Sequence, residues 1–233
     1  MNDLAPTART TVHRIPARAR YDRAFIDAVL DEGLVAAVGF VHEGQPFVMP
    51  LAYARLGDQL LLHGARASRA LAGGAAGTPL CVTVTLLDGL VLARSAFHHS
   101  LNYRSVVILG EAREVSEPGE KRAALLAIVE HVLPGRSAEV RAPDDKEVAA
   151  TRVLALPISE ASAKVREGGP LDDERDMAQV CWAGHLPLAL TPSGPPVADG
   201  PQAAPPGAIA AYRRPRRLDP SSAGSAGPRP IPR

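Results

Sequence analysis

Residues 34–64 read "LVAAVGFVHEGQPFVMPLAYARLGDQLLLHG", and this stretch decides the fold. Three apolar runs rich in Val, Leu and Ala are separated by two short polar breaks, "HEGQP" at 42–46 and "RLGDQ" at 55–59. Breaks of this length that contain glycine are typical of β-hairpin loops. The stretch therefore predicts three consecutive antiparallel strands.

The elements around this stretch predict a mainly β protein with small α helices. Consecutive strands joined by short loops pair antiparallel, and the regular strand–helix alternation of a parallel sheet is absent. We expect six antiparallel strands that close into a small barrel. The other predicted elements are a helix in 21–33 that ends at Gly33, a brief helix in 65–74, strands at about 80–94 and 103–115, a helix in 117–135 capped by Ser116, and a sixth strand at 151–167.

The chain divides into one domain and two loose ends. Residues 191–233 hold 11 of the 22 prolines, six Arg and two Asp, so we expect a disordered Pro/Arg-rich tail. Within it, "YRRPRR" (212–217) is either a solubilising charge cluster or a contact for an acidic partner. Residues 1–20 are predicted to be flexible in the same way. The folded domain is then expected to span 21–190.

Composition excludes several classes of function. The net charge of +1 comes from the basic tail, so the domain itself is mildly acidic and no nucleic-acid partner is expected. No apolar run reaches the length of a membrane span, and the first twenty residues lack the apolar core of a secretory signal. We therefore expect a cytoplasmic protein with no membrane partner. The two cysteines, Cys81 and Cys181, are predicted to be buried, reduced thiols.

One segment carries phosphate-binding chemistry. In "LLLHGARASRAL" (60–71) a strand ends at His63–Gly64, and a loop with Ser68 and Arg69 opens a helix. A hydroxyl and a guanidinium at a helix start can bind phosphate oxygens, and a glycine lets the backbone approach a ligand closely. The alternative is a simple helix cap with solvated arginines.

Two further segments are rich in unusual side chains. "RSAFHHSLNYRSVVILG" (94–110) places His98 and His99 between two strands, but adjacent residues of an extended chain point to opposite faces, so no metal site is expected. Tyr103, Arg104 and Ser105 instead predict the polar lining of a pocket. "VCWAGHLPL" (180–188) contains Trp182, which is either a packing anchor or the wall of a site for a flat ligand.

Five phrases together resemble one family. They are "FVMPLAYAR", "LLLHGARASRAL", "LLDGLVLARSAFHHSLNYRSVVILGEA", "AKVREGGPLDD" and "VCWAGHLPL", and they cover most of residues 20–190. In this order they are similar to the pyridoxamine 5'-phosphate oxidase-like, FMN-binding split-barrel superfamily, in its flavin-nucleotide-binding branch with relatives linked to nitroimidazole resistance. The resemblance implies a six-stranded antiparallel split barrel that forms a homodimer, with FMN in clefts between the subunits.

The resemblance also implies roles for single residues. The isoalloxazine ring would lie along the second strand, the ribityl chain near the end of the third, and the phosphate on the loop after it. Arg69 is followed by Ala70 where the oxidase has a lysine, so one phosphate charge is missing and Arg66 is a substitute. The implied cofactor-binding residues are Met49, Pro50, Leu51, Ala52, Tyr53, His63, Gly64, Ser68, Arg69, Arg104, Ser105 and Trp182.

The function expected from the resemblance is that of an FMN-dependent oxidoreductase acting on a small molecule between subunits, with the redox chemistry supplied by the flavin. Three alternatives stay open: a non-catalytic flavin carrier or sensor, a haem protein with His63, His98 or His99 as axial ligand, and a reductase that detoxifies nitroaromatics. No catalytic residue is assigned, and His63 is the best candidate because an imidazole titrates near neutral pH. Asp172 and Asp173 are expected in a solvated turn.

Overall fold

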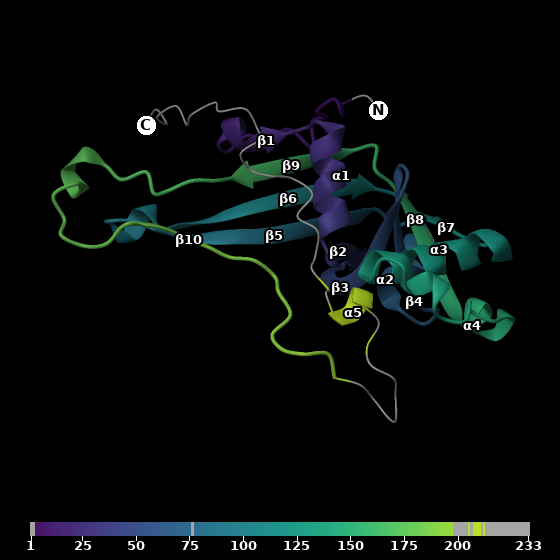
Figure 1. Ribbon diagram of the computed structural model, residues 1–233. Coiled ribbons are helices and arrows are strands. Elements are labelled where there is room, and N and C mark those ends of the chain that lie inside the picture. The colour runs from purple at the N-terminus through teal and green to yellow at the C-terminus, as the bar shows by residue number, and fades with distance from the viewer. Residues whose placement is uncertain (1–2, 76, 198–204, 206, 211, 213–233) are drawn as a thin grey trace.

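The structure, a computed structural model, describes residues 3–75, 77–197, 205, 207–210 and 212. Within this part of the chain, ten strands form one antiparallel sheet in the order β1-β9-β6-β5-β2-β3-β4-β8-β7, and β10 pairs with β5 (Figure 1). The predictions for the tail fall largely on residues outside those described. The strands are β1 (Ala19–Arg20), β2 (Val35–His42), β3 (Gln45–Leu56), β4 (Gln59–Ala65), β5 (Leu80–Leu92), β6 (Ser100–Gly110), β7 (Arg113–Glu114), β8 (Thr151–Pro157), β9 (Ala161–Arg166) and β10 (Gly184–Pro187).

The helices are short and lie around the sheet. The α-helices are α1 (Arg23–Glu32), α2 (Arg69–Ala75), α3 (Pro118–Val132), α4 (Asp145–Ala150) and α5 (Gly207–Ala210). The 3-10 helices are η1 (Pro16–Arg18), η2 (Ala96–His98), η3 (Arg136–Ala138) and η4 (Glu174–Asp176). The cap of α3 is Glu117, whose carboxylate accepts hydrogen bonds from the Gly119 and Glu120 N–H groups, so the prediction of Ser116 was wrong.

The two predicted hairpins are confirmed. Between β2 and β3, Glu43 and Gly44 both have positive φ angles, of 50° and 76°. This is the backbone of a two-residue type I′ loop, whose twist matches that of the flanking strands. Gly57, with φ of 58°, opens the turn between β3 and β4. Local turn chemistry therefore sets the register of the first three long strands.

The mainly β, antiparallel split-barrel prediction is confirmed, but the sixth strand is broken. Residues 151–167 form two strands, β8 paired with β4 and β9 paired with β6. The break follows Pro157, whose nitrogen carries no hydrogen for a ladder bond. At the bend the Ile158 N–H donates to Asp58 O, and Glu160 O accepts from the Leu109 N–H. The bend carries the chain from one end of the curled sheet to the other.

The main core lies between α1 and the inner face of the curled sheet. Ile26, Val29 and Leu30 of α1 are fully buried against residues such as Val84 and Ile108. Burying each such side chain contributes about 1.5–3 kcal/mol. A smaller apolar cluster lies between α3 and strands β3, β4 and β8. Figure 1 shows α1 crossing the strands and α3 on the other side of the molecule from the β5–β6 hairpin.

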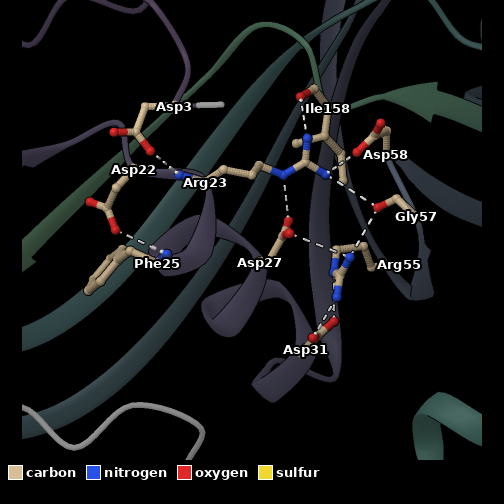
Figure 2. Close-up of polar contacts among 10 residues, drawn as sticks. All are labelled: Asp3, Asp22, Arg23, Phe25, Asp27, Asp31, Arg55, Gly57, Asp58 and Ile158. Carbon is tan, nitrogen blue, oxygen red and sulfur yellow. Dashed lines mark hydrogen bonds and ion pairs between the residues drawn. The ribbon is translucent and has the colours of Figure 1, made fainter. Parts of the chain in front are cut away.

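Ion pairs attach α1 to the turn between β3 and β4 (Figure 2). The buried Arg23 donates to Asp27 one turn further on and lies 3.0 Å from Asp58. Arg55 makes a two-point contact with Asp31 at 2.7 Å through both Nε and Nη2. Its hydrogen bond to Asp31 raises the pKa of Arg55 against the lowering effect of burial. These contacts fix the helix against the hairpin that carries the candidate site.

The first twenty residues, predicted to be flexible, make specific contacts where they are described. Ala19–Arg20 forms β1 on the edge of β9, and the Thr7 hydroxyl donates to the Glu160 carboxylate at 2.6 Å. The Tyr21 hydroxyl donates to Thr10 O and accepts from the Val12 N–H. The segment covers the sheet edge next to the bend at Ile158–Glu160, and its mobility stays a prediction.

Candidate functional site

The loop between β4 and α2 begins the candidate site. The Ser68 N–H donates to Ala65 O at 2.9 Å, and Ser68 O accepts from the Ala72 N–H, so Ser68 stands at the start of α2. The Arg69 guanidinium lies 4.7 Å from the centre of the Phe47 ring, which ties α2 to β3. A Cβ on Gly64 would lie 2.7 Å from Leu71 Cδ1, so this glycine is required by the packing of α2. Its predicted role in ligand approach stays a prediction.

Two cations that sequence reasoning missed lie beside this loop. Arg152 of β8 is paired in register with Gly64 and donates to Arg66 O at 3.0 Å. Lys121 of α3 is 6% exposed as a residue and lies within electrostatic range of Arg66, Arg152 and Glu114. Burial lowers the pKa of Lys121, and nearby Arg66 lowers it further, against the opposing effect of Glu114.

This cluster of Arg66, Lys121, Arg152 and Glu114 has three cations and one carboxylate. Glu114 acts on Lys121 and also contacts Arg152 at 3.3 Å, so one carboxylate is shared by three cations. The excess positive charge beside the loop would be reduced by a bound anion. An electropositive loop of this kind could accept a phosphate, and Lys121 offers a positive charge in addition to Arg69. A sequence signal existed, because Lys121 falls on the buried stripe of α3 with Ala124 and Ile128.

His63, the candidate catalytic residue, ends β4 next to this loop. It is half-buried, and its Nδ1 atom is buried without a hydrogen-bond partner among the described residues. Burial lowers the pKa of His63 below its ordinary value of 6.5, and the neighbouring Ala52 backbone opposes the shift. The lowered pKa favours the neutral form of the imidazole.

The five predicted residues of β3 alternate between two faces, as strand geometry requires. Met49, Leu51 and Tyr53 turn inward, and the buried Tyr53 hydroxyl donates to Leu30 O at 2.6 Å. Pro50 and Ala52 turn outward, where Pro50 is exposed. A ring lying along the outside of β3 would therefore contact Pro50 and Ala52, while the other three residues support the strand from the core.

The outward side of four neighbouring strands forms a surface that we call the outer face. Cross-strand partners such as Ala37 with Pro50 and Thr83 lie side by side on it. Its side chains are small or apolar, and Val48 is 70% exposed. Cys81 is exposed there and Cys181 is exposed elsewhere, so the prediction that both thiols are buried was wrong. The outer face comprises Val35, Ala37, Gly39, Val41, Val48, Pro50, Ala52, Cys81, Thr83, Thr85, Leu87, Tyr103, Ser105, Val107 and Leu109.

Arg104 and Ser105 are neighbours in β6 but point to opposite faces. Ser105 lies on the outer face opposite Thr85. Arg104 is 2% exposed and donates to both oxygens of Glu32 and both oxygens of Asp88 at 2.6–2.9 Å. Burial alone would lower the pKa of Arg104, but the hydrogen bonds to Asp88 and Glu32 raise it overall. Four of its five N–H donors are thus used inside the protein.

Trp182 lies on a different part of the molecule from the β4–α2 loop. It is 67% exposed and stands just before β10, which pairs with the distal half of β5. We call residues 87–102 and 170–187 the arm; Figure 1 shows its strands extending away from α2. Within one chain, therefore, the structure brings together Ser68, Arg69 and His63 but leaves Trp182 apart from them.

The end of the arm holds both predicted loop histidines. The His99 Nδ1 atom lies 2.9 Å from Ser95 O, and His98 Nε2 lies 3.4 Å from Asp173. Ligand atoms of His98, Asp173 and Asp176 lie within 4.8 Å of one another, a grouping that the sequence spacing did not reveal. Asp172, expected in a solvated turn, instead has a side chain that is 2% exposed and accepts two hydrogen bonds at 2.8 Å from Arg94.

Fold and site together define an antiparallel split-barrel protein with an electropositive loop after its third long strand and an exposed, flat outer face. The chain belongs to the pyridoxamine 5'-phosphate oxidase family, whose sequence profile matches residues 22–165. No curated protein matches the chain. Among the helices of the described residues, none has both the length and the apolar character needed to cross a membrane.

Three solved structures show the relationship. The flavocytochrome Anf3 from Azotobacter vinelandii is 40% identical with a TM-score of 0.81, covering 90% of this chain and 99% of its own. A FAD and haem binding protein from Mycobacterium smegmatis is 39% identical with a TM-score of 0.72, covering 81% and 94%. A proposed 5-nitroimidazole antibiotic resistance protein from Bacteroides thetaiotaomicron is 23% identical with a TM-score of 0.54, covering 63% and 86%. The third likeness shows the fold alone.

Proposed function

We propose that the protein binds a flavin nucleotide and serves as a redox protein for a small molecule. The observation that carries the proposal is the excess of cations, Lys121, Arg66 and Arg152, beside the Ser68–Arg69 loop. These residues would hold a phosphate of the flavin, and Pro50 and Ala52 would support its ring. The two relatives near 40% identity, a flavocytochrome and a FAD and haem binding protein, support flavin as the cofactor. We expected FMN; the relative that binds FAD makes FAD an equal candidate.

When bound, the flavin supplies hydride or electron transfer, and the chain's residues position and neutralise it. The cations of the loop would fix the phosphate end, and the ring would lie on the outer face along Pro50 and Ala52. His63, at the end of β4 and paired in register with Val153, is the candidate proton acceptor when the substrate changes its charge, because its lowered pKa favours the neutral imidazole. Nitroaromatic reduction has only the fold likeness to support it and is not proposed.

We propose that two copies pair through the outer face and the arm, as the homodimer expected from the sequence. The outer face exposes Val35, Val41 and Val48, an apolar grouping that is unusual for a free surface. Trp182 cannot reach the loop of its own chain, and in such a pair it would close the site of the partner. Light scattering of the purified protein would show the solution mass.

Replacing Lys121 by methionine is expected to weaken flavin binding by roughly 10- to 100-fold, because a hydrogen bond to a charged phosphate contributes about 1.5–3 kcal/mol. The titration follows flavin absorbance and fluorescence quenching with FMN and FAD, and the tighter ligand identifies the cofactor. Riboflavin, which lacks phosphate, is expected to bind the wild type and Lys121→Met equally.

The same variant tests whether any lost affinity reflects unfolding. Lys121→Met replaces a largely covered cation, which Arg66 and Arg152 repel, by an apolar side chain, so its melting temperature is expected to equal or exceed that of the wild type. Lys146→Met, which removes an exposed lysine from α4, serves as the matched control with unchanged flavin affinity. If Lys121→Met binds FMN and FAD as tightly as the wild type does, the proposed phosphate site is contradicted. If the wild type binds no flavin, the proposed function is contradicted.

A second candidate function is haem binding, which the same two relatives favour by their descriptions as a flavocytochrome and a FAD and haem binding protein. Haem requires an imidazole or other axial ligand and an apolar surface for the macrocycle. The histidines on the arm and the exposed apolar side chains around them meet these requirements. We propose that haem binds there, apart from the flavin loop.

A further inference from the structure

His99 stands in the connection between the arm strands β5 and β6, directly after η2. Its Nδ1 atom lies 2.9 Å from Ser95 O, and a carbonyl oxygen can only accept a hydrogen bond. The neutral ring must therefore carry its proton on Nδ1, which leaves the lone pair on Nε2. This is the arrangement found in metal-binding histidines, where a hydrogen bond to one ring nitrogen orients the other toward the metal.

The other candidate histidines are arranged differently. His98 Nε2 faces the Asp173 carboxylate at 3.4 Å, so its outer nitrogen is already directed at a protein group. His63 is half-buried at the end of β4, with a buried Nδ1 atom that no described residue binds. His99 is exposed, and its Nε2 atom makes no hydrogen bond with the described residues. Only in His99 do a fixed ring and an accessible lone pair occur together among these three.

Apolar side chains lie exposed on the same arm. Phe97 is 89% exposed and Leu101 is 47% exposed, on either side of His99 in the chain. Val180 is exposed on the segment that leads into β10, the neighbour of β5. Exposed apolar side chains that flank a free imidazole in the chain indicate a binding surface. A flat, largely apolar macrocycle with an iron at its centre fits both this surface and the free imidazole nitrogen.

We propose that His99 is an axial ligand of the haem iron, bonded through Nε2, with Phe97 and Leu101 against the macrocycle. The inference rests on the proposed haem binding. The Ser95 carbonyl fixes the tautomer of the ligand, and the iron accepts the Nε2 lone pair without any transfer of protons or electrons. His98, its neighbour, is held by Asp173 and does not ligate.

The experiment is a haem titration of the purified full-length protein, read from the Soret band of the bound haem. For His99→Ala we expect about tenfold or weaker haem affinity and a shifted or broadened Soret band. Added imidazole is expected to restore the wild-type band, which a merely structural role of His99 would not allow. His98→Ala, the matched control, is expected to keep the wild-type band.

Flavin absorbance and circular dichroism, recorded on the same samples, report folding independently of haem. If His99→Ala keeps the wild-type band and affinity, or if His98→Ala or His63→Ala alone loses them, the assignment of His99 is overturned while haem binding stands. If the wild type itself shows no Soret band, haem binding is overturned together with the assignment. Flavin binding is judged separately in each case.

Discussion

Arg104→Met is expected to lower the free energy of unfolding by roughly 3–5 kcal/mol, the largest effect of any polar substitution in the domain. Its guanidinium is 2% exposed and makes four hydrogen bonds to the carboxylates of Glu32 and Asp88. Both partners are themselves largely buried, with side chains 12% and 14% exposed. Removing the cation leaves two negative groups facing each other inside the protein, and methionine keeps the apolar stem so that little packing is lost.

Urea unfolding followed by circular dichroism measures this effect. Ser105→Ala, at the next position but on the outer face, is the matched control and is expected to change stability by about 0.5 kcal/mol or less. Adding Glu32→Gln and Asp88→Asn to Arg104→Met is expected to recover part of the loss, because the uncompensated charges disappear with the cation. A variant Arg104→Met as stable as the wild type would show that the ion pairs contribute nothing.

The same variant separates two roles for Arg104. The resemblance to flavin proteins implies a cofactor contact, whereas the geometry assigns its donors to the link between α1, β5 and β6. If the guanidinium serves only the fold, the Arg104→Met variant should bind FMN and FAD nearly as well as the wild type at urea concentrations low enough for it to stay folded. A loss of FMN and FAD affinity in the folded variant would support the implied role of Arg104 as a cofactor-binding residue.

Local sequence was sufficient for the elements whose structure depends on neighbouring residues. The hairpin at Glu43–Gly44 depends on turn geometry, and the helix ending at Gly33 depends on a short apolar stripe. Both patterns can be read directly from the amino-acid sequence. The sixth strand was predicted as one because its apolar pattern continues through Ile158, yet the sheet curls there and the chain changes partners. Which strands pair is a tertiary property that the pattern does not carry.

The candidate site likewise contains residues that the sequence revealed and residues that only the structure revealed. Ser68 and Arg69 form a local motif at a strand end, so the sequence revealed them. Lys121 and Arg152 come from α3 and β8, more than fifty residues further along the chain, and only folding places them beside that loop. Cys81 and Arg104 show a further limit: strand alternation predicts that neighbours face opposite sides, but tertiary packing decides which side is covered.

Gly33→Ala is the second substitution with a large expected effect, a destabilisation of about 3 kcal/mol. Sequence reasoning assigns Gly33 to the end of α1, and the structure places it there, with its N–H donating to Val29 O at 3.0 Å. Its φ of −67° is available to any residue, so backbone freedom does not explain the glycine. An added Cβ would lie 2.5 Å from Val84 Cγ1 and 2.6 Å from the Tyr53 hydroxyl, distances that force a buried group to move.

The two groups that would move are both fixed. Val84 is 1% exposed in the main core, and the fully buried Tyr53 holds Leu30 O through its hydroxyl. Urea unfolding should show the loss for Gly33→Ala but not for Gly169→Ala, where a new Cβ meets nothing within 4 Å. Val84→Ala alone leaves a cavity, yet combined with Gly33→Ala it makes room for the methyl group, so the double variant should be more stable than the sum of the single losses. If the stability losses of the two single variants simply add in the double variant, the contact with Val84 is not the reason for a glycine at position 33. Other residues would then determine the turn from α1 into β2.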